Sequence, residues 1–173
     1  AISELRVPST FRSVLRQATV LSRRSKMTDP HMEDTEIQFA LLLHTFADTP
    51  YRPAMPLLRR LVRKSQNIGA QPRAVAIWCL GKYYQGRTNE QLCLQLVDRL
   101  NDINSMIAEA AEVRAMCAVG LGRMKTKLGQ DSLERFVKDT NPTVRAASQW
   151  TLNKRDGTPI PPPPVKIVGK DDW

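Results

Sequence analysis

Apolar residues recur along most of this chain at intervals of three and four positions, the spacing that gathers them on one side of an α-helix. Three stretches, over residues 72–82, 113–123 and 144–154, share this spacing and can be set in register. Each has Arg in its second column, Ala in the third, Leu in the ninth, Gly or Asn in the tenth and Lys or Arg in the eleventh. The chain therefore repeats a helical unit, at periods of 41 and 31 residues.

The repeated helices should pack into a common core. Their first, fourth, fifth and ninth columns fall on one helical face and hold apolar or small residues. The fifth column is the smallest, which allows neighbouring helices to approach closely. We therefore expect the ninth-column residues Leu80, Leu121 and Leu152 to be buried.

A second amphipathic stretch precedes each repeated helix, over residues 53–64, 89–100 and 131–138. The helices are therefore expected in pairs, and a further helix over residues 35–47 should cap the N-terminal end of the stack. Residues that favour the starts and ends of helices predict where these helices begin and end. Asp131-Ser132 and Asn141-Pro142 are expected to begin helices, and Gly69, Gly86 and Gly129 are expected between helices.

The third repeat and the helix end before it carry a distinctive set of residues, namely Asp139, Asn141-Pro142, Val144-Arg145-Ala146 and Trp150-Thr151-Leu152. This set resembles a HEAT repeat of the short bacterial type found in phycobilisome-lyase-like proteins. The resemblance covers roughly residues 50–155. It implies an all-α, right-handed HEAT-like solenoid of about three to four helix pairs.

The resemblance also implies a ladder of hydrogen bonds between units, formed by an Asp at the end of one helix and an Arg six residues later. Asp139 and Arg145 have this spacing. The corresponding positions before Arg73 and Arg114 hold Asn67 and Ala108, so the acidic position is filled in one repeat of three. Glu109 stands beside Ala108.

Charge is unevenly distributed. The chain carries a formal charge of +9, and six of its 26 Lys and Arg residues lie in residues 1–28 against one acid, Glu4. Residues 1–28, the basic arm, therefore hold more than half of the excess positive charge. The following repeat domain, over residues 29–156, has a charge ordinary for a soluble protein.

The basic arm has a helical apolar face that includes Phe11 and Leu21, with Arg12, Arg16 and Arg23 elsewhere on the helix. Arg24, next to Arg23, is a further candidate contact. Four interpretations remain open. The apolar face docks on the first repeat and the arginines are solvated, or the arginines bind an acidic protein or nucleic-acid phosphates. Alternatively, the arm is a membrane-surface helix or an organellar targeting segment.

A second basic group lies along the stretch that precedes the first repeat, namely Arg59, Arg60, Arg63 and Lys64. Arg59 and Arg63 share one helical face, and Arg60 and Lys64 share the next. This group is either the solvated side of a helix or a ridge that docks phosphates or acidic side chains.

The chain changes character at residue 157, and residues 157–173 form a Pro-rich tail. Its run of prolines favours the extended polyproline II conformation. The tail is either a spacer or a ligand for a partner's groove, with Pro161, Pro162 and Trp173 as its candidate contacts.

Catalytic signatures are sparse. The two His residues show no metal-binding spacing, and no phosphate-binding glycine motif follows a strand pattern. Glu109 and Glu112 are expected to be exposed charges. We therefore expect no catalytic residue, metal, cofactor or small-molecule substrate. The three Cys residues lie within helical patterns and are expected to be small buried hydrophobes in a reducing compartment, the cytoplasm or an organellar matrix.

These features favour a non-enzymatic protein–protein interaction module, such as a scaffold, an adaptor or an accessory subunit of a larger assembly. The alternative is a nucleic-acid-binding protein that uses the basic arm and the Arg59–Lys64 ridge. A third class is a lyase or DNA glycosylase on a HEAT-like fold. The longest apolar stretch, Phe39–Leu43, is too short to span a membrane.

Overall fold

The computed structural model describes residues 2–23, 32–47, 49–65, 67–104, 106–124 and 126–153, and every regular element in these ranges is helical. The predicted all-α class is confirmed for this part of the chain. In chain order the elements are α1 (Ile2–Leu21), α2 (Met32–His44), the 3₁₀ helix η1 (Arg52–Ala54), α3 (Met55–Val62), α4 (Ala70–Tyr83), α5 (Glu90–Asn101), α6 (Ala111–Arg123), α7 (Lys127–Phe136) and α8 (Pro142–Asn153).

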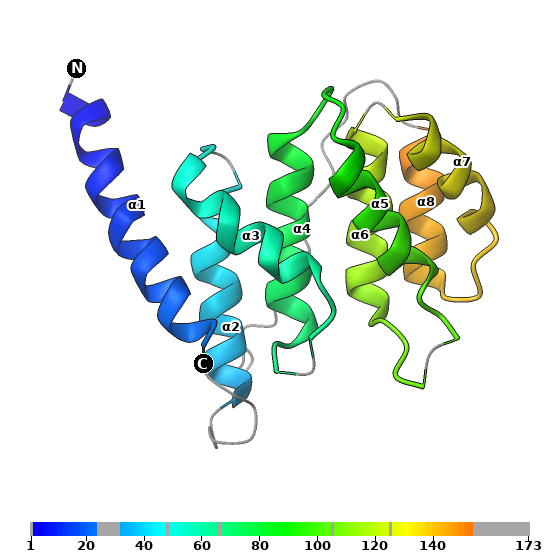
Figure 1. Cartoon of the computed structure of the whole chain (residues 1–173), viewed down its shortest axis with the longest axis horizontal. Coiled ribbons are helices and arrows are strands. Elements are labelled where there is room, and N and C mark those ends of the chain that lie inside the picture. The colour runs from blue at the N-terminus through cyan, green and yellow to red at the C-terminus, as the bar shows by residue number, and fades with distance from the viewer. Residues whose placement is uncertain are drawn as a thin grey trace, which may run out of the picture.

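The helices after α1 form two rows that lie one in front of the other (Figure 1). One row contains α2, α4, α6 and α8, and each of these helices packs against the next. The other row contains α3, α5 and α7, which cover α4, α6 and α8 respectively. The helix α1 packs against α2 at one end. The three sequence repeats therefore lie on consecutive members of one row.

The middle helices of that row are buried on all sides, although the sequence pattern predicted one buried face. Residues 72–81 of α4 and 113–121 of α6 are buried without interruption. Each of these helices has a neighbour on both sides and a third helix in front. Leu80 and Leu121 are buried as expected, whereas Leu152 is only partly buried because the described residues place no further helix beyond α8.

Small residues let the helices of this row approach one another. A Cβ atom added at Gly81 would lie 3.1 Å from the Cα atom of Gly120, and one added at Gly122 would collide with the Thr151 side chain. The fifth-column residues Ala76, Cys117 and Ser148 are fully buried. The tenth and fifth columns of the repeat therefore have a packing role.

Of two predicted helix starts, one is confirmed and the other is wrong. The helix α8 begins at Pro142 as expected, and the Asn141 side chain accepts a hydrogen bond from the backbone N–H of Thr143 at 3.0 Å. The expected start at Asp131-Ser132 is wrong, because α7 begins at Lys127 and runs through Gly129. Thr126 is its N-cap and accepts a hydrogen bond from the N–H of Gly129 at 3.2 Å.

The apolar face of α1 docks on the first helices of the repeat region. Phe11 stacks on Tyr51 with a centroid separation of 5.4 Å and contacts Phe46 at 5.8 Å, and Ala18 is fully buried. The docked orientation expected from the first interpretation of the arm is therefore present. Within the described ranges, no helix is long and apolar enough to cross a membrane.

The three cysteines are buried, as predicted. Burial, together with nearby Glu109, raises the pKa of the Cys117 thiol well above its ordinary value, so this thiol stays protonated.

We expect thiol labelling of the native chain to be about a hundredfold slower, or more, than labelling in denaturant, because the thiols must await opening of the core. Timed alkylation with mass spectrometry measures this ratio. A cysteine that reacts in native buffer at the rate of a free thiol would contradict the buried placement.

Candidate interaction surface

The exposed sides of α3 and α5 border a hollow of about 290 Å³. The two helices bury their Leu-rich faces against α4 and α6, and the polar residues between those apolar positions remain at the surface. Among the described residues, no carboxylate lines the hollow, and its lining side chains are Pro56, Arg59, Arg60, Arg63, Gln91 and Gln95.

Arg59 is oriented by a tyrosine from the repeated helix behind it. Its Nη2 atom donates a hydrogen bond to the Tyr84 hydroxyl at 2.6 Å, and the guanidinium group lies 5.6 Å from the centre of the Tyr84 ring. Both contacts are with a neutral group, so the charge of Arg59 is positioned but not neutralised.

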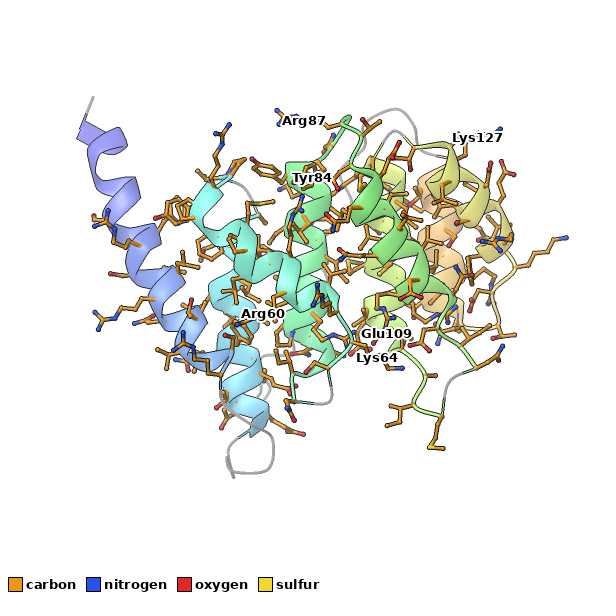
Figure 2. The ribbon with its side chains drawn as sticks, viewed as in Figure 1. Arg60, Lys64, Tyr84, Arg87, Glu109 and Lys127 are labelled. Atoms are coloured by element: carbon orange, nitrogen blue, oxygen red, sulfur yellow. The ribbon has the colours of Figure 1, made fainter. Side chains whose placement is uncertain are left out.

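Arg60 connects the hollow to the basic arm. Its Nη2 atom donates a hydrogen bond to Ser22 Oγ at 2.5 Å, which places the end of α1 beside α3. Figure 2 shows Arg60 on the front of the molecule, on the side that faces α1. The partner is again neutral, and the Arg60 side chain is exposed.

Arg63 and Lys64, adjacent in sequence, have different surroundings. The exposed Arg63 side chain forms no hydrogen bond or ion pair with any residue in the described ranges. Lys64 instead pairs with Asp102 at 2.6 Å and also donates to the carbonyl oxygen of Ile107. Lys64 therefore ties α3 to the connection between α5 and α6 and does not line the hollow.

The arm presents a second basic group. Arg12, Arg16 and Arg23 are exposed, and their spacings of four and seven residues place them on one side of α1 and its C-terminal turn. This stripe ends next to Ser22, and therefore close to Arg60. Arg24, Pro161, Pro162 and Trp173 lie outside the described residues.

A buried ladder of ion pairs joins successive repeats. Arg73 of α4 pairs with Glu109, and Arg114 of α6 pairs with Asp139. All four residues are buried. Each arginine thus reaches the acid that precedes the next helix of the row, and Glu109 fills the place for which the sequence showed no Asp.

Two expectations change with this ladder. The expectation that Glu109 is an exposed charge is wrong, although Glu112 is exposed as expected. Arg145 donates to the backbone oxygen of Asp139 at 2.6 Å and not to its carboxylate. The sequence signal for the role of Glu109 was its position, one residue after the place where an Asp was expected. The longer side chain of Glu makes up for this shift.

The eleventh-column cations form a separate cluster that sequence analysis did not anticipate. The Arg123 guanidinium lies 4.0 Å from the centre of the Trp78 ring, and the Lys82 ammonium lies 6.0 Å from it. Burial lowers the pKa of Arg123. Both contacts are cation–π interactions, and the contact of Arg123 with Trp78 fastens α6 to α4.

The hollow combines groups suited to anions. A guanidinium offers a planar pair of donors that matches a carboxylate or phosphate, and Gln amides add neutral donors. Gln91 and Gln95 were not predicted, although their four-residue spacing on the polar side of α5 was a detectable signal. Within the described ranges, no group of three His, Cys, Asp or Glu side chains is placed to hold a metal ion.

Comparisons with known proteins identify no relative. No protein-family model matches the chain, and neither a curated protein nor a solved structure gives a match.

Proposed function

We propose that this chain is a HEAT-like helical solenoid that acts as a non-enzymatic protein-interaction module, and that the hollow between α3 and α5 binds an acidic segment of its partner. The solenoid assignment is supported by the three repeats on consecutive helices of one row and by the buried Arg–acid pairs between them. Such a stack holds its surface residues at fixed separations, which lowers the entropic cost of binding.

The observation that carries this proposal is the concentration of positive charge around the hollow. Three guanidinium groups and no carboxylate line it within the described part of the chain, and Arg59 and Arg60 form their hydrogen bonds with neutral hydroxyl groups. A bound carboxylate relieves the mutual repulsion of these cations and gains charge-assisted hydrogen bonds, each contributing about 1.5 to 3 kcal/mol. The hollow also suits a flexible chain, which can enter a concave site.

The substitution Arg63→Glu tests the hollow directly. We expect it to weaken binding of a fluorescein-labelled poly-L-glutamate peptide by about tenfold to a hundredfold, because it replaces an attractive charge with a repulsive one. Fluorescence anisotropy at physiological ionic strength measures the affinity. Because Arg63 is exposed and makes no side-chain bond within the described residues, its replacement should leave the unfolding midpoint unchanged.

Arg87→Glu is the matched control. Arg87 is also exposed, the charge change is identical, and the residue lies at the upper edge of the molecule away from Arg60 (Figure 2). A general effect of net charge would weaken peptide binding equally in both variants. The proposed site is contradicted if Arg63→Glu and Arg87→Glu bind the peptide alike.

Nucleic-acid binding is the second candidate, and the Arg60–Ser22 hydrogen bond favours it. This bond brings the C-terminal end of α1, where the arginine stripe ends, next to a residue that lines the hollow. A single-stranded oligonucleotide in the same anisotropy assay distinguishes the two functions. Nucleic-acid binding requires a steep salt dependence that falls when Arg16 is replaced by Glu, whereas the proposed module binds the peptide regardless of Arg16.

A further inference from the structure

The connection between α5 and α6 exposes a cluster of large apolar side chains. Met106 is fully exposed, and Ile103 and Ile107 are 48% and 54% exposed. We refer to these three residues as the apolar cluster. Single exposed apolar residues are common on protein surfaces, but three within five positions are typical of a contact site. Figure 1 shows that this connection extends beyond the ends of the neighbouring helices.

The backbone on both sides of the apolar cluster is held in place. The Asp102 carbonyl oxygen accepts a hydrogen bond from the N–H of Glu109 at 2.9 Å, which closes the base of the connection. Lys64 binds the Asp102 carboxylate at 2.6 Å and donates to the Ile107 carbonyl oxygen. Glu109 is itself anchored by Arg73. The cluster is therefore presented on an ordered support, which reduces the ordering cost of a contact.

Lys64 links the connection that carries the apolar cluster to the border of the basic hollow. Lys64, which holds the connection, directly follows Arg63, which lines the hollow. One extended segment, which advances about 3.3 Å per residue, can therefore reach both sites within a few residues. The cations favour acidic residues at one end of such a segment, and the exposed cluster favours apolar residues at the other.

We infer that the hollow and the apolar cluster form one composite docking site for a protein segment in which acidic residues are followed or preceded by large apolar ones. This inference rests on the proposed function and specifies the chemistry of the partner. The acidic part binds Arg59, Arg60 and Arg63, and the apolar part covers Met106 and its two neighbours. A planar lipid surface fits this arrangement less well, because it cannot enter a hollow.

Two labelled peptides test the composite site in the full chain. One is the poly-L-glutamate peptide, and the other has leucines in place of its glutamates near one end, prepared in both orientations. The better orientation of the mixed peptide is expected to bind about tenfold more tightly, because the cluster buries apolar surface that the first peptide cannot provide. Met106→Ser should remove this gain and leave the affinity for poly-L-glutamate unchanged.

Leu94→Ser is the matched control, since Leu94 is 58% exposed on α5 but lies outside the apolar cluster. Leu94→Ser should preserve the added affinity of the mixed peptide. Ile103→Ser, at a second position of the apolar cluster, should reduce that added affinity. Circular dichroism verifies that each variant is folded. The inference is overturned if the leucines add no affinity, or if the gain survives Met106→Ser or is lost equally with Leu94→Ser.

The outcomes separate this inference from the proposed function. Binding of both peptides with equal affinity, still dependent on Arg63, would retain the acidic site and overturn the composite one. Loss of all peptide binding would overturn both. Two other occupants also overturn the inference, namely phosphatidylserine vesicles that bind only through Met106, and a second copy of the chain whose Met106-dependent association appears in analytical ultracentrifugation.

Discussion

Asp139→Ala is expected to lower the free energy of unfolding by about 3 to 5 kcal/mol, because it leaves the buried guanidinium of Arg114 without its acid. The remaining contacts of Arg114 are a 2.9 Å hydrogen bond to the Leu100 carbonyl oxygen and the ring of Phe136 at 5.6 Å. Neither is an opposite charge. Denaturant unfolding monitored by circular dichroism measures the change.

A double-mutant cycle separates the ion pair from the other contacts of Asp139, whose carboxylate also accepts a hydrogen bond from the Asn141 N–H at 2.8 Å. If the uncompensated charge causes the loss, Arg114→Met should cost less in the Asp139→Ala background than in the native chain. Asp131→Ala, at an exposed acid of α7, should change stability by less than about 0.5 kcal/mol. An Asp139→Ala variant as stable as the native chain would contradict the buried ladder.

Leu121→Ala is the second large effect, with an expected loss of about 2 to 5 kcal/mol. Leu121 is 1% exposed near the C-terminal end of α6, a helix that packs against α4, α5, α7 and α8, so the vacated volume cannot collapse easily. The measurement is the same unfolding experiment. The loss combines the transfer free energy of the removed carbons with the cost of the cavity.

Two other leucines provide a comparison for the loss expected at Leu121. Leu152 occupies the same column of the third repeat but is only partly buried, so Leu152→Ala should cost less than Leu121→Ala. Leu128, which is 42% exposed on α7, should respond least to the same change. Equal losses at the three positions would show that burial in the row of repeats does not govern stability.

The candidate surface was predictable only in part. The sequence placed Arg59, Arg60 and Arg63 on one ridge, because positions three and four apart on a helix are neighbours whatever surrounds it. It grouped Lys64 with them, yet this residue binds Asp102 from another helix pair. The apolar cluster was not predicted, because an irregular connection has no periodicity that separates exposed apolar residues from buried ones.

The buried ladder shows the same division. The repeated Arg column was visible in the sequence, and Asp139 was identified before the third repeat. Glu109 was assigned to the surface, because the local pattern does not show that Arg73, distant in sequence, lies against it. Glu109 lies in the connection before α6 and pairs with Arg73 of α4, the preceding helix of the row.

Sequence alone was enough to predict the helical class, the order of the repeated helices, the apolar face of α1 and the start of α8, since these depend on residues within one or two turns of each other. The packing of the helices instead establishes which cations line the hollow, which acid pairs with Arg73, and that α4 and α6 are buried on every side. These properties depend on distances between residues far apart in the chain, and those distances exist only once the two rows have packed together.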